Sequence, residues 1–146
     1  MTMQVFKHTI VIDRPRDQVF DLFVDLGRTP HWRQYVTSLE RLDSGPLEAG
    51  SRIRATMDLM GEATSYELEV LACERPSLWR HRSNETDFTG HIEYRFEPEG
   101  SGTRVTMSCV ARPISLYGWL ALPLMWLARG KSYKEQLPAL KRAAEA

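Results

Sequence analysis

Residues 103–145 read TRVTMSCVARPISLYGWLALPLMWLARGKSYKEQLPALKRAAE, and this stretch decides the fold. Its first part has the two-residue period of a strand, with Val105, Met107 and Cys109 on one face and polar residues on the other. After Pro113 the composition becomes helical, apolar at first and charged toward the end. We therefore expect a last strand followed by a long C-terminal helix that covers the concave face of one antiparallel sheet.

The region before this stretch contains further short runs of period two, separated by turns rich in glycine and proline. Strands are predicted over residues 4–12, 37–43, 51–59, 63–73, 78–84, 90–97 and 103–111. After the first strand, Asp13 offers an N-cap and Pro15 suits a first helical turn, which predicts a short helix. A second short helix is expected over residues 30–35. Each strand has one apolar and one polar face, which is typical of an antiparallel sheet covered on a single side.

The expected fold is therefore α+β, with a seven-stranded curved antiparallel sheet gripping a long C-terminal helix and two short helices after strand 1. The 146 residues match the usual size of one domain, so a single domain over residues 1–146 is expected. Pro123 and Pro138 each remove an intrahelical donor, which predicts kinks or a restart of the C-terminal helix.

Composition excludes several classes of partner and compartment. Nineteen basic residues balance nineteen acidic ones, so no nucleic acid is expected as a partner. The N-terminus lacks an apolar signal-peptide core, and we expect a cytoplasmic protein in which Cys73 and Cys109 are packed thiols. The apolar run from Ile114 to Ala128 is shorter than the roughly twenty residues that span a bilayer. No stable membrane insertion is expected.

The sequence carries no recognisable motif for a metal, a nucleotide or a catalytic nucleophile. We therefore expect no metal and no cofactor. The carboxylates of Asp58, Glu67 and Glu69 fall by parity on the outer face of the sheet, where they are expected to be solvated.

Bulky side chains with a few polar tips gather on the inward face of the predicted strands. Such a set suits a small-molecule site, because rings supply apolar contact and polar tips set the orientation of the ligand. The ligand-binding candidates are His8, Trp32, Met57, Tyr66, Trp79, His81, Tyr94, Met107, Trp119 and Trp126. For any one of these residues, packing in the core is the alternative role.

His81 is the strongest polar candidate, because it shares its face with Trp79 and Ser83. A histidine on the apolar face needs a partner or lines a cavity. His8 is a weaker candidate of the same kind, whereas His31 and His91 are expected to be exposed. If a reaction is catalysed, the acid–base candidates are His81, Tyr66 and Tyr94.

Four segments of the chain resemble those of the START-like, helix-grip superfamily (SRPBCC). They are I12-D-R-P-R-D-Q-V-F-D-L-F-V-D25, H31-W32, E97-P-E-G-S-G-T-R-V-T106 and L137-P-A-L-K-R-A-A-E145. The sequence is most similar to the polyketide cyclase/dehydrase and lipid-transport branch. The resemblance implies the same fold and a pocket between sheet and helix, but it does not identify a ligand.

Three functions follow from these observations. The first is binding of a hydrophobic small molecule of lipid, polyketide, isoprenoid or quinone type. The second is a cyclase or dehydratase (a lyase) that uses histidine and tyrosine side chains of the pocket as acid and base. The third is a protein-interaction role, including a homodimer, through the apolar start of the C-terminal helix.

Overall fold

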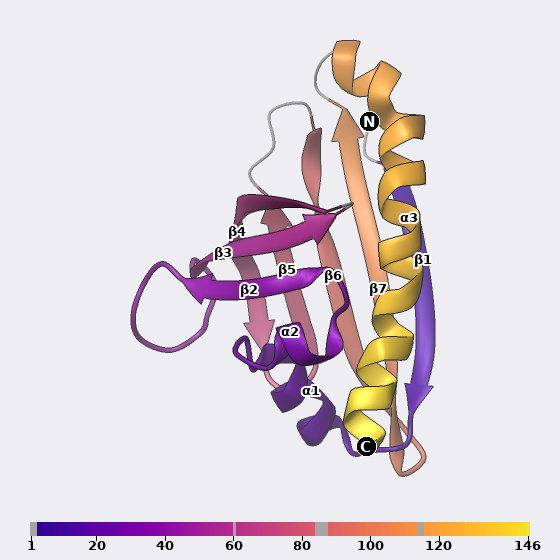
Figure 1. The fold of residues 1–146 in the computed structure, drawn as a ribbon. Helices are drawn as coiled ribbons and strands as arrows, with labels where there is room; N and C mark the ends of the chain where they lie inside the picture. The colour runs from indigo at the N-terminus through magenta and orange to yellow at the C-terminus, as the bar shows by residue number, and fades with distance from the viewer. Residues whose placement is uncertain (1–2, 60, 84–87, 114–115) are drawn as a thin grey trace.

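A computed structural model describes residues 3–59, 61–83, 88–113 and 116–146 of the chain. It contains one sheet of seven antiparallel strands, and α3 lies along the side of the sheet formed by β1 and β7 (Figure 1). The strands are β1 (Met3–Ile12), β2 (Val36–Arg41), β3 (Arg52–Leu59), β4 (Glu62–Glu74), β5 (Leu78–Ser83), β6 (Phe88–Glu99) and β7 (Gly102–Pro113). The helices are α1 (Arg16–Val24), α2 (Thr29–Trp32) and α3 (Leu116–Glu145). The predicted α+β fold is confirmed.

The sheet has the strand order β1-β7-β6-β5-β4-β3-β2. The first strand therefore pairs with the last, and β2 forms the opposite edge. In Figure 1, β2 and β3 run across the view whereas β1 and β7 run along it, so the sheet curves around α3. This curvature gives the sheet a concave face, and the two short helices lie near one end of it.

The core lies on the concave face and is filled by alternate residues of the strands. Val105 and Met107 of β7 and Phe96 of β6 are fully buried, and the end of α3 adds Leu137 and Leu140. These side chains follow the two-residue and helical periods that the sequence shows. The alternation thus determines which face of each strand is available for a site.

One local prediction was wrong, and one alternative of a second is excluded. Asp13 does not cap α1, because the helix begins at Arg16 and Pro15 occupies the cap position with an extended backbone, φ −60° and ψ 149°. The backbone N–H of Asp13 instead donates to Glu145 Oε2 at 2.7 Å. Of the kinks or restart expected at Pro123 and Pro138, the restart does not occur, because α3 is one continuous helix from Leu116 to Glu145, and the kinks stay a prediction.

The closing contacts at the end of α3 hold the helix to the start of the chain. Lys141 Nζ donates to the carbonyl oxygen of Val11 at 2.8 Å and pairs with Glu145 at 2.7 Å. Arg14 donates to the backbone oxygen of Glu145 at 3.0 Å. The last turn of α3 is therefore fixed against the connection between β1 and α1.

Candidate functional site

An aromatic wall covers the middle of the concave face. It consists of Trp79 and His81 from β5, Tyr94 from β6 and Phe23 from α1. Trp79 and Tyr94 are direct partners in neighbouring strands, and both are buried. The Phe23 ring lies with its centroid 5.8 Å from that of Trp79 and 4.6 Å from that of Tyr94. The parity of β5 and β6 therefore brings three of the predicted site residues together.

His81 is buried in this wall and has a defined hydrogen-bond partner. Trp79 Nε1 donates to His81 Nδ1 at 2.8 Å, and the imidazole stacks on Tyr94 with ring centroids 6.4 Å apart. Burial lowers the pKa of His81 from 6.5 to about 3, and the positive charge of Arg33 adds to this effect. The imidazole is therefore neutral at pH 7. Because Nδ1 accepts from Trp79, the ring proton is on Nε2.

A polar chain leads from the wall toward α3. The hydroxyl of Tyr94 is hydrogen-bonded to the amide of Gln136, and Arg33 reaches the same amide from the other side, with Nε 2.8 Å from it. A guanidinium group only donates, so the amide oxygen of Gln136 faces Arg33. The amide nitrogen then donates to the Tyr94 hydroxyl. Gln136 is 3% exposed, so this series of hydrogen bonds lies inside the protein.

A cavity of about 300 Å³ lies where the α2–β2 connection faces the last turns of α3. Its walls are formed by Trp32, Arg33, Gln34, Tyr35, Glu135, Gln136, Ala139 and Arg142. Of the predicted site residues whose side chains the structure describes, Trp32 alone lines this cavity. The Gln136 side chain stands between the cavity and Tyr94, so the cavity adjoins the aromatic wall.

Some buried polar atoms around the site have no hydrogen-bond partner among the described residues. Trp32 Nε1 and Glu135 Oε2 belong to residues of the cavity wall, and Thr29 Oγ1 is in α2. His8 Nδ1 is a fourth such atom, on β1. Buried polar groups of this kind are usually satisfied by water or a ligand.

The remaining strand candidates lie on the concave face but differ in exposure. Met107 is fully buried, and Met57 accepts a hydrogen bond at Sδ from Tyr66 Oη over 2.8 Å. Tyr66 and His8 are half-buried. His8 is the register partner of Met107, so it lies at the β1 side of the sheet, away from β5. Their roles toward a ligand stay predictions.

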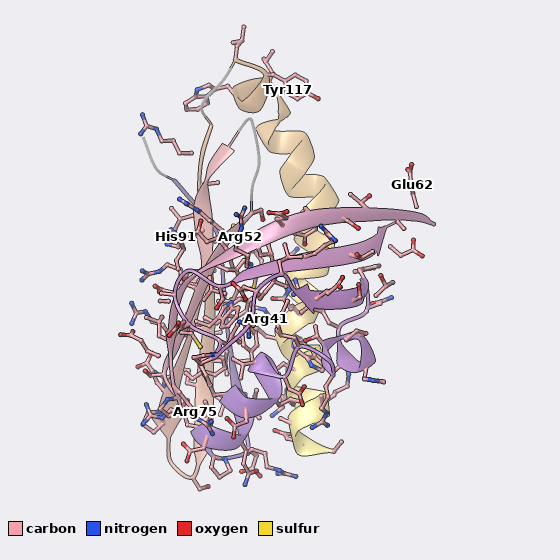
Figure 2. The ribbon with its side chains drawn as sticks, turned by 90° about the vertical axis from the view of Figure 1, so that its left-hand side faces the viewer. Arg41, Arg52, Glu62, Arg75, His91 and Tyr117 are labelled. Atoms are coloured by element: carbon pink, nitrogen blue, oxygen red, sulfur yellow. The ribbon has the colours of Figure 1, made fainter. Side chains whose placement is uncertain are left out.

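The start of α3 is exposed. Leu116, Tyr117 and Leu120 are 76%, 69% and 74% exposed, and the predicted site residue Trp119 is 49% exposed. Figure 2 shows Tyr117 at the end of the molecule where α3 begins. The side chain of Trp126 lies outside the described residues. The described part of the chain contains no helix that is long and apolar enough to cross a membrane.

Sequence reasoning missed Arg33 and Gln136. A signal for Gln136 was available, because it shares a helical stripe with the buried Ala139 and Leu140. A polar residue on a buried stripe needs a partner, which here is Tyr94. No comparable signal marks Arg33, since it follows α2 in an irregular segment.

The outer face of the sheet is charged and contains no candidate site among the described residues. Glu67 and Glu69 pair with Arg52 and Arg82, at 2.9 Å and 2.8 Å, and they are solvent-facing as predicted. Figure 2 shows Arg52 and His91 there; His91 is half-buried rather than exposed. Burial and the nearby charge of Arg80 lower the pKa of His91.

Metal ligands do not gather in the described residues, because they contain no group of three or more His, Cys, Asp or Glu side chains suited to a metal ion. Cys73 and Cys109 are not joined in a disulfide, and burial raises the pKa of the Cys73 thiol. The chemistry available at the aromatic wall is therefore that of aromatic surfaces, a neutral imidazole and a hydrogen-bonded phenol.

Comparison with solved structures places this geometry among known folds. TTHA0849 from Thermus thermophilus is 25% identical, with a TM-score of 0.75, and the match covers 94% of each chain. The Zhui aromatase/cyclase from Streptomyces sp. R1128 is 17% identical, with a TM-score of 0.77 over 99% of this chain and 94% of that chain. A START superfamily protein from Mycobacterium smegmatis is 14% identical, with a TM-score of 0.75 over 96% of both chains. The latter two similarities show the fold alone.

Comparison with curated proteins found no match. The family model described as "Polyketide cyclase / dehydrase and lipid transport" matches residues 3–145. Since this match spans nearly the whole chain and the helix-grip fold agrees with it, the protein belongs to the polyketide cyclase/dehydrase and lipid transport family of START-like proteins.

Proposed function

We propose that the protein binds a hydrophobic small molecule between the concave face of the sheet and α3. The observation that carries this proposal is the aromatic wall, in which bulky rings surround one neutral imidazole and one phenol. Apolar surface with a few polar groups is the usual lining of a small-molecule site. The family membership supports the same function, because this fold typically binds hydrophobic ligands.

The wall supports binding more than proton transfer by His81. An efficient general base has a pKa near the pH at which it works, whereas burial lowers the pKa of His81 to about 3. Its Nδ1 is already occupied by the indole N–H of Trp79. The remaining ring N–H is suited to donate a hydrogen bond to a ligand oxygen. His81 is thus proposed as an orienting contact.

A direct test uses the neutral fluorescent probe N-phenyl-1-naphthylamine and mass spectrometry of organic molecules that co-purify with the protein. The probe is expected to bind saturably, in the micromolar range, and decanol is expected to displace it. Trp79→Ala removes the largest ring of the wall and is expected to weaken probe binding about tenfold. Val19→Ala, a core truncation in α1, is the control for general loosening.

Two results would overturn this proposal. One is the absence of saturable binding together with the absence of any co-purifying organic molecule. The other is equal weakening by Trp79→Ala and Val19→Ala after both variants are shown to be folded. His81→Gln, which keeps an acceptor for the indole N–H of Trp79, is a third variant in case Trp79→Ala does not fold.

The exposed start of α3 favours a second function, association with another protein or with a second copy of this chain. Leu116, Tyr117 and Leu120 present apolar surface that the described residues leave uncovered. Light scattering across protein concentrations tests self-association, and Leu120→Glu is expected to abolish it. A protein that stays monomeric at about 100 µM would contradict the homodimer.

A further inference from the structure

The cavity between the α2–β2 connection and α3 has two arginines in its wall and one carboxylate. Arg33 and Arg142 line it together with Glu135. Neither arginine forms an ion pair with a carboxylate in the described part of the chain. On the protein surface, by contrast, Arg52 and Arg75, labelled in Figure 2, pair with carboxylates at 2.9 Å and 2.5 Å.

The charge of Arg33 is not neutralised by its hydrogen-bond partner. That partner is the amide oxygen of Gln136, which is neutral. The positive charge of Arg33 therefore acts on groups inside the protein, and it helps to lower the pKa of His81. A half-buried positive charge without a counter-ion stabilises an anion placed beside it, because screening by water is reduced there.

We propose that this cavity binds the carboxylate of an amphipathic ligand whose apolar part lies against the aromatic wall. This inference rests on the proposed binding function and names the class of ligand. The planar guanidinium group of Arg33 suits a carboxylate, since it presents several donors in one plane. Arg142, which is exposed, adds charge at the rim of the cavity.

The position of the cavity fits a head group rather than a whole ligand. Its volume of about 300 Å³ is at the lower end of the range for small-molecule sites. Gln136 separates it from Tyr94, so a carboxylate beside Arg33 is one side chain away from the aromatic wall. Trp32 Nε1, buried without an acceptor among the described residues, offers a further donor in the same wall.

The test compares three ligands of matched chemistry: decanoate, decanol and acetate. Each displaces N-phenyl-1-naphthylamine or is titrated by calorimetry at low salt. Decanoate is expected to bind about tenfold more tightly than decanol, and acetate to bind far more weakly than either. Raising the salt concentration is expected to weaken decanoate binding and to leave decanol binding unchanged.

Substitutions then assign the preference to the cavity. Arg33→Leu is expected to reduce the preference for decanoate to about twofold or less while decanol still binds. Arg33→Lys keeps the charge and is expected to retain part of the preference. Arg54→Leu, an exposed arginine on the outer face of β3, is the matched control and is expected to have no effect.

The outcomes separate this inference from the proposed function. If no ligand or probe binds, the binding function itself is wrong. If decanol and decanoate bind equally in the wild type at low salt, the protein binds apolar ligands but the carboxylate site is refuted. Tight binding of acetate alone would show an anion site unrelated to an amphipathic ligand, and it would also overturn the inference. The wild-type comparison stands even if Arg33→Leu fails to fold.

Discussion

Replacing His81 with glutamine changes how the stability of the protein depends on pH. The neutral imidazole is buried, and its pKa is about 3 in the folded protein against 6.5 when exposed. Between these values the unfolded chain binds a proton that the folded protein does not. Above pH 6.5 the titration of His81 therefore does not lower the free energy of unfolding. As the pH falls from 6.5 toward 3, the folded state loses stability.

The size of this effect follows from the difference in pKa. Each pH unit in this window changes the free energy of unfolding by about 1.4 kcal/mol, so the fall from pH 6.5 to 4.5 corresponds to a loss of roughly 3 kcal/mol from His81. In His81→Gln this loss is absent, whereas the acceptor for Trp79 Nε1 is kept by the glutamine oxygen. The variant is thus expected to be less sensitive to mild acid than the wild type.

Urea unfolding at pH 7.5, 6.5, 5.5 and 4.5 measures the effect in both proteins. Other groups titrate in this range, so the difference between the two pH profiles is the quantity that reports His81. His91→Gln is the matched control, because His91 is only half-buried on the outer face and should change the profile less. Parallel profiles for the wild type and His81→Gln between pH 6.5 and 4.5 would refute the reasoning.

Three further predictions concern packing, the polar chain and metal dependence. Gly90→Ala is expected to destabilise the protein by at least about 3 kcal/mol in thermal unfolding, because the added Cβ would lie 2.0 Å from the carbonyl oxygen of Val110. Gly27→Ala is the control: its added Cβ meets no close contact, so the variant should be tolerated. Tyr94→Phe is expected to cost about 1–2 kcal/mol in urea unfolding, because the buried amide nitrogen of Gln136 loses its acceptor while the amide oxygen keeps Arg33. An unchanged midpoint would contradict this. Dialysis against a chelator is expected to leave the melting temperature unchanged, whereas a fall of many degrees would reveal a structural metal.

The strands and the final helix were predictable because their periods are local properties of the sequence. Alternation assigned Trp79, His81 and Tyr94 to one face, and the structure places them together. The cap of α1 was not predictable in this way. Asp13 has a side chain that often caps helices, but α1 begins only at Arg16, so Pro15 occupies the cap position. The backbone N–H of Asp13 is instead bound by Glu145 from the last turn of α3.

The cavity could not be predicted for the same reason. It joins Arg33, which follows α2, to Gln136 on α3, and no spacing rule relates two positions so far apart. At Pro138, too, contacts between distant parts of the chain outweigh the local preference of the sequence, because α3 is not interrupted there. Leu137 and Leu140 on either side of this proline are fully buried, so packing holds the helix together where the local rule predicts a break.

The pairing of the first strand with the last determines the order in which the chain can fold during synthesis. β1 leaves the ribosome first, yet its sheet partner is β7, with Thr9 and Thr106 side by side although they are 97 positions apart. Strands β2 to β7 form a meander of neighbouring hairpins, which closes short loops and forms early. β1 therefore stays without its sheet partner until β7 has emerged, so the pairing of β1 with β7 is the last long-range step in forming the sheet.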